Sequence, residues 1–226
     1  MKLIVAGATG FVASEVIRQA VRMPEITSII ALARKPITAD TPESSKIKNV
    51  VIKDYGEYPE EVKKELAGAD ACIWTVAVTP TRSRLLNAAE VKRVCHDYTA
   101  AGLHAMYDAG PAKPFRFLYM SGSNSQRDPA KKPWLLGDYS VMRGAVENLV
   151  HDFAAEHDAF EVCVAKPGIM SGAGVLGSAM NLILNSTGVV PAASVEIVSR
   201  AMLKQVVHGF EKEQLENSDL VRIGSK

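Results

Sequence analysis

The sequence predicts a doubly wound α/β fold, in which a mainly parallel sheet carries helices on both faces. Short apolar runs with little polar alternation recur along the chain, and such runs are typical of strands buried on both faces of a parallel sheet. They alternate with segments of helical periodicity, which indicates βαβ units with right-handed crossovers. The third observation is the first unit itself, where apolar residues 3–6 lead directly into a glycine-rich turn and a helical pattern.

Each element follows from this alternation. The expected order of strands in the sheet is 3-2-1-4-5-6, plus a seventh strand, and ligands of such folds bind outside the carboxyl ends of the strands. The loops after strands 1, 2, 4, 5 and 6 should therefore line one cleft. The predicted strands are residues 2–6, 28–33, 50–52, 71–75, 115–120, 160–165 and 219–223, and the predicted helices are residues 12–21, 59–67, 85–109, 137–156 and 194–209.

The bulk composition is that of an ordinary globular chain. With 226 residues, 47% hydrophobic and 23% charged, residues 1–226 are expected to form a single α/β domain, with residues 167–193 as a small insertion on the substrate side. The net charge of +1 gives no electrostatic case for nucleic acid or an anionic membrane. No apolar run reaches the length of a membrane span. We therefore expect a cytoplasmic protein, monomeric or homodimeric, with a small-molecule substrate.

Cysteine and histidine indicate neither a disulfide framework nor a metal site. Cys72, Cys95 and Cys163 are widely spaced in apolar or helical contexts, as expected for reduced core thiols. The five histidines are scattered without metal-ligand spacing. No metal is expected.

The glycine turn Gly7-Ala-Thr-Gly-Phe-Val-Ala13 is the most specific motif of the chain. It would present backbone N–H groups at a helix N-terminus to the pyrophosphate of a dinucleotide. Gly7 allows the sharp turn, Gly10 lets the phosphate approach the backbone, and Ala13 still permits close helix–strand packing. The alternative interpretation is a tight turn that binds nothing.

The ends of the second and third strands carry further candidates. Arg34 and Lys35 follow strand 2, where an acid would bond the ribose 2′-hydroxyl of NAD, so two cations favour the 2′-phosphate of NADP. A solvated pair of cations is the alternative. Asp54 after strand 3 could accept from the adenine amino group, with Tyr55 packed beside the base, or Asp54 could simply begin a turn.

A second group of polar residues follows strand 5. Hydroxyls of Ser121 and Ser123 could bond a substrate carbonyl, although Ser-Gly runs also make plain loops. Tyr139 and Arg143 lie four residues apart and therefore share one helix face. A phenol near a cation has a lowered pKa and can give a proton to a carbonyl that receives hydride. An ordinary surface pair is the alternative.

Taken together, the chain resembles the short-chain dehydrogenase/reductase superfamily, in its atypical, epimerase-like and NmrA-like branch. The resemblance covers nearly the whole chain and implies an NAD(P)-binding Rossmann fold. It rests on five motifs in the family's order: Gly7–Ala13, Leu32–Pro36, Ser121–Ser123, Tyr139–Arg143 and Lys166–Gly168.

The resemblance also implies roles. Tyr139 would be the proton donor or acceptor, and Ser121 or Ser123 would orient the substrate carbonyl. Residues 166–169 would lie beside the nicotinamide, and residues 75–77 would lie beside the adjoining ribose. The implied cofactor-binding residues are Gly7, Thr9, Gly10, Phe11, Val12, Arg34, Lys35, Asp54, Tyr55, Thr75, Val76, Ala77, Lys166, Pro167, Gly168 and Ile169, and the implied catalytic residues are Tyr139, Arg143, Ser121 and Ser123.

One position departs from the family pattern. The family's lysine in Tyr-x-x-x-Lys is Arg143 here, and an arginine can bond ribose hydroxyls and lower the phenol pKa but cannot deprotonate as part of a proton relay. The leading hypothesis is an NADP(H)-dependent oxidoreductase acting on a small apolar carbonyl or enone. The alternatives are an NADP(H)-binding regulatory module without turnover and a non-redox isomerase or cyclase that uses Tyr139 as an acid.

The substrate side is the least specified part of the sequence. Trp134-Leu135-Leu136 precedes Tyr139, and Ile169-Met170 lies with Met180 and Leu182 in the last insertion. These apolar residues could roof a hydrophobic pocket. Plain core packing is the alternative.

Overall fold

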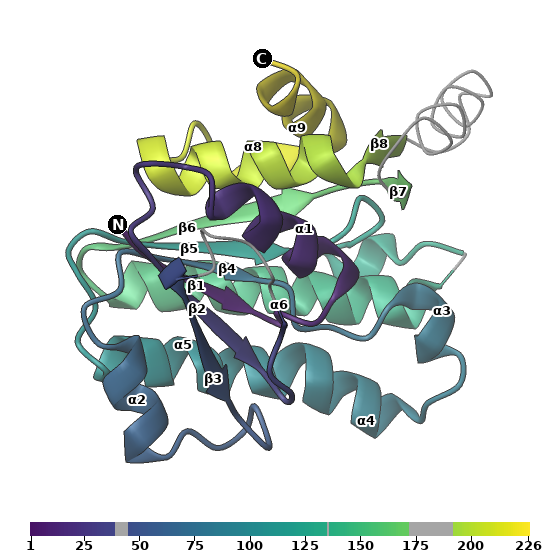
Figure 1. The fold of residues 1–226 in the computed structure, drawn as a ribbon. Coiled ribbons are helices and arrows are strands. Elements are labelled where there is room, and N and C mark those ends of the chain that lie inside the picture. Colours follow the sequence, from purple (N-terminus) through teal and green to yellow (C-terminus); the bar gives the residue numbers. More distant parts are fainter. Residues whose placement is uncertain (39–44, 135, 172–191) are drawn as a thin grey trace.

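The structure, a computed structural model, describes residues 1–38, 45–134, 136–171 and 192–226. A parallel sheet of seven strands has the order β3-β2-β1-β4-β5-β6-β9, which confirms the predicted order of the first six strands. Helices α1, α8 and α9 cover one face, and α2, α5 and α6 cover the other (Figure 1). The strands of this sheet are β1 Lys2–Ala6, β2 Ser28–Ala33, β3 Ile47–Val51, β4 Ala71–Trp74, β5 Phe115–Met120, β6 Phe160–Lys166 and β9 Gln214–Glu216.

The helices and the small elements complete the described chain. Most helices match their predicted ranges within one or two residues. Their bounds are α1 Phe11–Ala20, α2 Glu60–Leu66, α3 Pro80–Ser83, α4 Ala88–Lys92, α5 Tyr98–Asp108, α6 Gly137–Glu156, α8 Val195–His208 and α9 Asn217–Gly224, with a 3-10 turn at Pro129–Lys131 and a two-stranded sheet of β7 Ile169–Ser171 and β8 Ala192–Ser194.

The apolar runs work as predicted because both faces of the sheet are covered. In β1, Leu3 and Val5 pack into the core under α1 and α8, whereas Ile4 and Ala6 pack into the core on the α5 and α6 side. All four side chains are fully buried. Alternate strand residues therefore serve two separate cores, which removes the polar alternation of a one-sided sheet.

The predicted strand at residues 219–223 is wrong. These residues belong to α9, and the seventh strand is the short β9 that precedes it. A capping box between Glu216 and Asp219 begins the helix, and Leu220 and Ile223, three residues apart, are its buried side chains. A short apolar run of this kind fits a strand, but its two buried side chains are three residues apart, which is the spacing of a helix.

The long helix predicted at residues 85–109 is interrupted. Asn87 caps α4 by accepting a hydrogen bond from the Glu90 amide, so the helix begins at Ala88. Residues Arg93–Asp97 then form a π-helical segment that continues into α5. The segment places the buried Cys95 thiol 3.3 Å from the Val78 amide, beside the loop after β4. A π-helical segment inside a helix often lies at a functional site.

Candidate functional site: the glycine turn and the carboxyl edge of the sheet

The glycine turn between β1 and α1 has the backbone that its sequence requires. Gly7 has φ +83°, a region that residues with a Cβ rarely adopt, and a Cβ there would lie 2.7 Å from Thr75 Oγ1. The Gly10 amide donates to the Gly7 carbonyl at 2.7 Å and closes the turn. Gly10 is the N-cap residue of α1 and has extended backbone. The backbone conformation and the close Thr75 hydroxyl both call for glycine at position 7.

The N-terminus of α1 is open for an anion. No side chain caps this helix, and its first turn holds no acidic residue. Among the residues described, the backbone amides of Thr9, Phe11 and Val12 donate no hydrogen bond to another protein group. Thr9 and Gly10 are exposed, and Phe11 is 54% exposed. Free amides at a helix N-terminus, approached over a glycine, are the features that bind a phosphate group.

Tyr55 holds the glycine turn in place through its hydroxyl group, a role that the sequence did not predict. Its hydroxyl accepts a hydrogen bond from the Gly7 amide at 3.1 Å and donates to the Leu32 carbonyl at 2.9 Å. The ring is 4% exposed and packs edge-to-face against Trp74. Burial raises the pKa of Tyr55 to about 12. The ring therefore lies in the core, and the expectation that it packs beside an adenine is corrected to a role in holding the turn.

Asp54 has the geometry of the turn-starting alternative. Its carboxylate accepts from the Gly56 amide at 2.8 Å and forms an ion pair with Arg93. The Gly56 hydrogen bond is the main cause of a lowered pKa at Asp54, with a further contribution from the Tyr98 hydroxyl. Both partners belong to the protein, so the carboxylate is already engaged where an adenine contact was expected.

Arg34 and Lys35 lie directly after β2, next to the glycine turn. The carbonyl of Leu32, near the end of that strand, accepts hydrogen bonds from the amides of Gly7 and Ala8 at 3.0 and 3.2 Å. Both basic side chains are exposed, and in the described ranges neither has a carboxylate within ion-pair distance. Within the described part of the chain, two cations without an acidic partner thus lie beside the glycine turn.

The loop after β4 borders the turn on its other side. The Thr75 hydroxyl donates to the Ala6 carbonyl at 2.8 Å and lies against Gly7. Val76 is buried and Ala77 is partly exposed. Of the predicted positions 75–77, Thr75 and the backbone of Val76 therefore lie against Gly7, whereas Ala77 packs with the Val78, Val91 and Cys95 cluster.

Tyr139 and Arg143 share one face of α6, as predicted, but their partners are protein groups. The Tyr139 hydroxyl donates to the Val78 carbonyl at 2.7 Å. Arg143 is 3% exposed and donates to the Met120 carbonyl at 2.6 Å, with its guanidinium carbon 5.2 Å from the centre of the Tyr119 ring. The prediction that the Tyr139 pKa is lowered is wrong. Burial raises this pKa, and the opposing effect of the Arg143 charge is smaller.

A buried ionic network surrounds Ser121. Its hydroxyl donates to Glu147 Oε1 at 2.6 Å, and Glu147 Oε2 lies 3.0 Å from Arg127 Nε and 3.3 Å from Lys166 Nζ. Glu147 is fully buried. Lys166, expected to pass the nicotinamide, instead directs its ammonium into this network, where it also donates to the Ser125 carbonyl at 3.1 Å. Glu147 is four residues beyond Arg143, and that helical spacing was the available sequence signal for it.

The two loops after β5 and β6 meet at the same edge. The Ser123 amide donates to the Pro167 carbonyl at 2.9 Å, and Ser123 is exposed. The Gly168 amide donates to Asn217 Oδ1 at 2.9 Å. Ile169 follows and is 46% exposed. Of the two predicted serines, Ser123 is therefore the one whose hydroxyl faces solvent.

The expected apolar roof is described in part. Trp134 is 97% exposed, and Met170 packs against the core under α1 and α8. Trp134, which precedes α6, and Ile169, the first residue of β7, are exposed apolar side chains in the segments that follow β5 and β6. Leu135, Met180 and Leu182 lie outside the described residues, as does most of the predicted insertion 167–193.

A parallel sheet in this order, with an open glycine turn at the start of its first helix, defines a dinucleotide-binding fold. The chain belongs to the NAD(P)H-binding family, because the model of that family matches residues 7–162. Its NAD(P)-binding fold is that of the short-chain dehydrogenase/reductase and epimerase-like superfamily, which confirms the resemblance inferred from the motifs.

Similar proteins agree with this assignment. Protein FMP52, mitochondrial, from Candida albicans (strain SC5314 / ATCC MYA-2876) is 25% identical over 173 residues, which are 76% of this chain and 68% of the relative. The PhqB reductase domain from Penicillium fellutanum has TM-score 0.71 and 18% identity, over 96% of this chain and 67% of that one. DesIV, a dTDP-glucose 4,6-dehydratase from Streptomyces venezuelae with NAD and TYD bound, has TM-score 0.69 and 16% identity, over 99% and 80% of the two chains.

These relatives leave the location of the chain open. In the described part of the chain, no helix is long and apolar enough to cross a membrane. The name of the Candida relative places that protein in mitochondria. The cytoplasmic location therefore stays a prediction, as does the oligomeric state.

Proposed function

We propose that the protein is an NADP(H)-dependent oxidoreductase that transfers hydride between the nicotinamide and a small apolar carbonyl or enone. The observation that carries the proposal is an open glycine turn beside two exposed cations, Arg34 and Lys35, which have no carboxylate partner among the described residues and follow the neighbouring strand. Exposed apolar side chains at the same edge, Trp134 and Ile169, fit an apolar substrate.

The residues present fit a dinucleotide. The free amides at the start of α1 suit a pyrophosphate, and a Cβ at Gly7 would collide with Thr75, so the turn keeps its shape. Arg34 is suited to hold a 2′-phosphate, since a guanidinium fork bonds phosphate oxygens bidentately, and Lys35 adds charge. When bound, the cofactor supplies or accepts the hydride.

Tyr139 is the proposed proton donor. Burial raises its pKa, so the phenol carries its proton at neutral pH and is a weaker acid than an ordinary tyrosine. Tyr139 Oη must leave the Val78 carbonyl to reach a substrate, and the exposed Ser123 hydroxyl is the better candidate to orient that substrate, because the Ser121 hydroxyl is held by Glu147.

Titration with NADPH and NADH tests the cofactor part. We expect NADPH to bind more tightly than NADH, and Arg34→Gln to remove most of that difference. Lys64→Gln, which removes an exposed charge on α2, is the matched control and should leave both affinities unchanged. Equal affinity of the two cofactors for the native protein would refute the 2′-phosphate argument, and no binding of either would refute the whole proposal.

NADPH oxidation with a panel of small apolar aldehydes, ketones and enones tests the reaction. Tyr139→Phe should bind NADPH normally and lose turnover at least about 100-fold, the usual contribution of a positioned acid. A phenylalanine variant with full activity would remove Tyr139 from the mechanism.

A regulatory, non-catalytic NADP(H)-binding module is the second candidate. The observation that favours it is Arg143, whose guanidinium bonds the Met120 carbonyl and lies against Tyr119, both groups of the protein. Tight NADPH binding without turnover on any member of the panel would favour this module over the enzyme. Product formation without a change in nicotinamide absorbance would instead indicate an isomerase or cyclase.

A further inference from the structure

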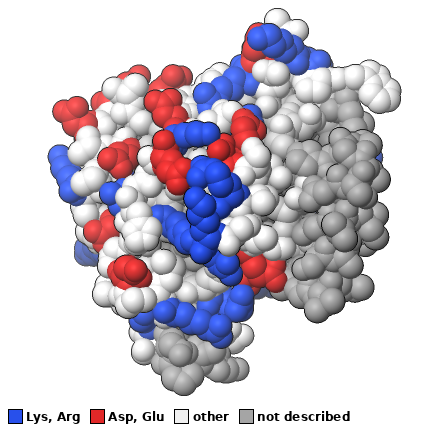
Figure 2. Space-filling view, turned by 90° about the horizontal axis from the view of Figure 1, so that it is seen from above, with Lys and Arg blue, Asp and Glu red and all other residues white. Residues whose placement is uncertain are grey.

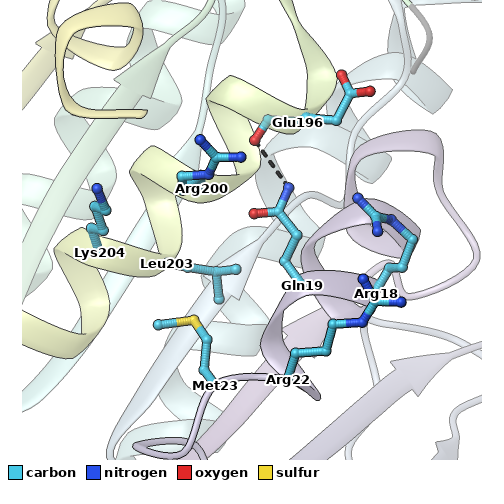
Figure 3. Close-up of a pocket in the computed structure, with 8 residues that line it drawn as sticks. All are labelled: Arg18, Gln19, Arg22, Met23, Glu196, Arg200, Leu203 and Lys204. Atoms are coloured by element: carbon cyan, nitrogen blue, oxygen red, sulfur yellow. Dashed lines mark hydrogen bonds between the residues drawn. The ribbon is translucent and has the colours of Figure 1, made fainter. Parts of the chain in front are cut away.

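A groove of about 450 Å³ lies between the C-terminal half of α1 and helix α8, away from the glycine turn (Figure 3). This volume is within the range of small-molecule sites. Four basic side chains line it, two from each side, and Met23 and Leu203 supply an apolar surface between them: Arg18 and Arg22 come from the α1 side, and Arg200 and Lys204 come from α8.

The basic side chains on the α1 side differ in their partners. Arg18 is held by Glu15 through two hydrogen bonds, Nε to Oε2 at 2.6 Å and Nη2 to Oε1 at 2.5 Å. Arg22 is exposed, and no carboxylate of the described residues lies within ion-pair distance of it. Arg22 therefore offers a whole guanidinium to a ligand, whereas the charge of Arg18 is already matched.

The basic side chains on α8 are fixed without being neutralised. Arg200 Nη1 donates to the Gly224 carbonyl at 3.0 Å, and Lys204 Nζ lies 3.4 Å from the Ile223 carbonyl, both at the end of α9. Carbonyl partners hold the side chains in place but carry no formal charge, and no described carboxylate pairs with either cation. Counting only the described residues, the groove thus contains three cations without an acidic partner, two of them held by carbonyls at the end of α9.

The charge of this face is a local feature. The whole chain has a net charge of +1, yet Figure 2 shows basic side chains gathered in a band across this face, with acidic side chains on its flanks. Glu196 is the acidic residue on the rim, and its carbonyl accepts a hydrogen bond from Gln19 at 3.0 Å, which ties α8 to α1. This tie fixes the spacing of the two sides of the groove.

The groove is separate from the proposed cofactor site. The glycine turn is at the start of α1, whereas Arg22 and Met23 follow its end. A helix of 10 residues is about 15 Å long, so the two sites lie at opposite ends of one helix. An anion in the groove and a dinucleotide at the turn would use different residues.

We propose that the α1–α8 groove binds an organic phosphate, held by Arg200 and Lys204 of α8 and by Arg22, whose exposed side chain turns toward them on binding, with a small hydrocarbon group placed on Met23 and Leu203. Guanidinium groups bind phosphate oxygens through paired charge-assisted hydrogen bonds, and lysine adds a point charge. The inference is independent of the oxidoreductase proposal, since no residue of the turn takes part.

Calorimetric titration with n-hexyl phosphate tests the groove. We expect saturable binding to the native protein, and Arg22→Gln and Lys204→Gln should each weaken it about tenfold, the usual effect of losing one charge-assisted hydrogen bond. Lys64→Gln on α2 makes the same change of net charge elsewhere and should have no effect. Circular dichroism and thermal melting check that each variant folds.

Each contrary result has a definite meaning. No saturable binding, or equal weakening by all three variants, would overturn the site. Inorganic phosphate binding as tightly as hexyl phosphate would overturn the role of Met23 and Leu203. Co-sedimentation with phosphatidic acid vesicles but not phosphatidylcholine vesicles would assign the phosphate to a lipid headgroup, and its absence would assign a free organic phosphate. NADPH affinity measured on the same variants should stay unchanged, which separates a failure here from a failure at the glycine turn.

Discussion

Glu147→Gln should destabilise the protein more than any exposed acid-to-amide change. Glutamine has nearly the same volume as glutamate and keeps one oxygen, but an NH2 group replaces the other. In the native protein, Glu147 Oε2 lies 3.0 Å from Arg127 Nε and 3.3 Å from Lys166 Nζ, so an NH2 group there would face two other donors. Glu147 is fully buried and Lys166 is 7% exposed, so the lysine would keep a buried charge without its carboxylate. Breaking such a pair from one side costs about 3–5 kcal/mol.

Urea denaturation measures this loss as a change in the free energy of unfolding. Glu161→Gln is the matched control, because it makes the same chemical change in an exposed pair with Arg116 at 3.2 Å. An exposed pair contributes under about 1 kcal/mol. The two variants should therefore differ several-fold in their effect on stability.

A double-mutant cycle isolates the ionic part. Lys166→Met removes the buried cation, so Glu147→Gln should cost less in that background than in the native protein, with Arg127 left as a partly exposed partner. A loss under about 1 kcal/mol for Glu147→Gln alone would refute the reasoning, since it would mean that water or a rearranged side chain satisfies the lysine. Strict additivity in the cycle would equally refute a direct Glu147–Lys166 coupling.

Three further changes test the turn and its surroundings. Gly7→Ala should cost at least about 1–2 kcal/mol in urea denaturation, because a left-handed backbone and a close hydroxyl both oppose a Cβ, whereas Gly122→Ala, with open space at its Cβ, should be near neutral. Tyr55→Phe should cost about 1 kcal/mol of stability and, if the cofactor proposal is right, should weaken NADPH binding because the turn loses its support. Asp54 has a lowered folded pKa, chiefly through Gly56, so its contribution is present above the unfolded pKa of about 3.9 and is lost as the pH falls through the folded value. Thermal melts between neutral and acidic pH should accordingly show a shallower acid-side decline for Asp54→Asn, and an identical decline would contradict this assignment.

The fold was predictable wherever local pattern and burial agree. The apolar runs of β1, β2 and β5 are buried on both faces of the sheet. Their residue bounds and their assignment as strands could therefore be predicted from the sequence. The sequence failed at α9, because Leu220, Val221 and Ile223 form a short apolar cluster that fits a strand as well as a helix. The capping box at Glu216 and Asp219 was the local signal for the helix.

The candidate site was predictable at the turn and less so around it. Gly7 is dictated by local backbone and could be found from its neighbours in sequence. Tyr55 reaches the same turn from 48 residues away, and its role depends on the β2–β3 crossover bringing it under Leu32. The burial that raises the Tyr139 pKa likewise comes from tertiary packing, whereas sequence reasoning counted the nearby charge of Arg143 and left out desolvation.

The position of Arg143 links these findings. Tyr139, Arg143 and Glu147 are spaced by four residues on one face of α6, and they contact in turn the loop after β4, the end of β5 and the serine that follows it. A lysine at position 143 carries one ammonium, whereas the guanidinium can bond the Met120 carbonyl with one nitrogen and point a second one toward Cys95. The Arg143 side chain therefore joins the end of β5 to the π-helical segment. The face of α6 that carries the proposed proton donor, Tyr139, is held by these contacts and by the bond from Tyr139 to the Val78 carbonyl. Because an arginine does not deprotonate, residue 143 holds this face of α6 in place but cannot take part in a proton relay to Tyr139.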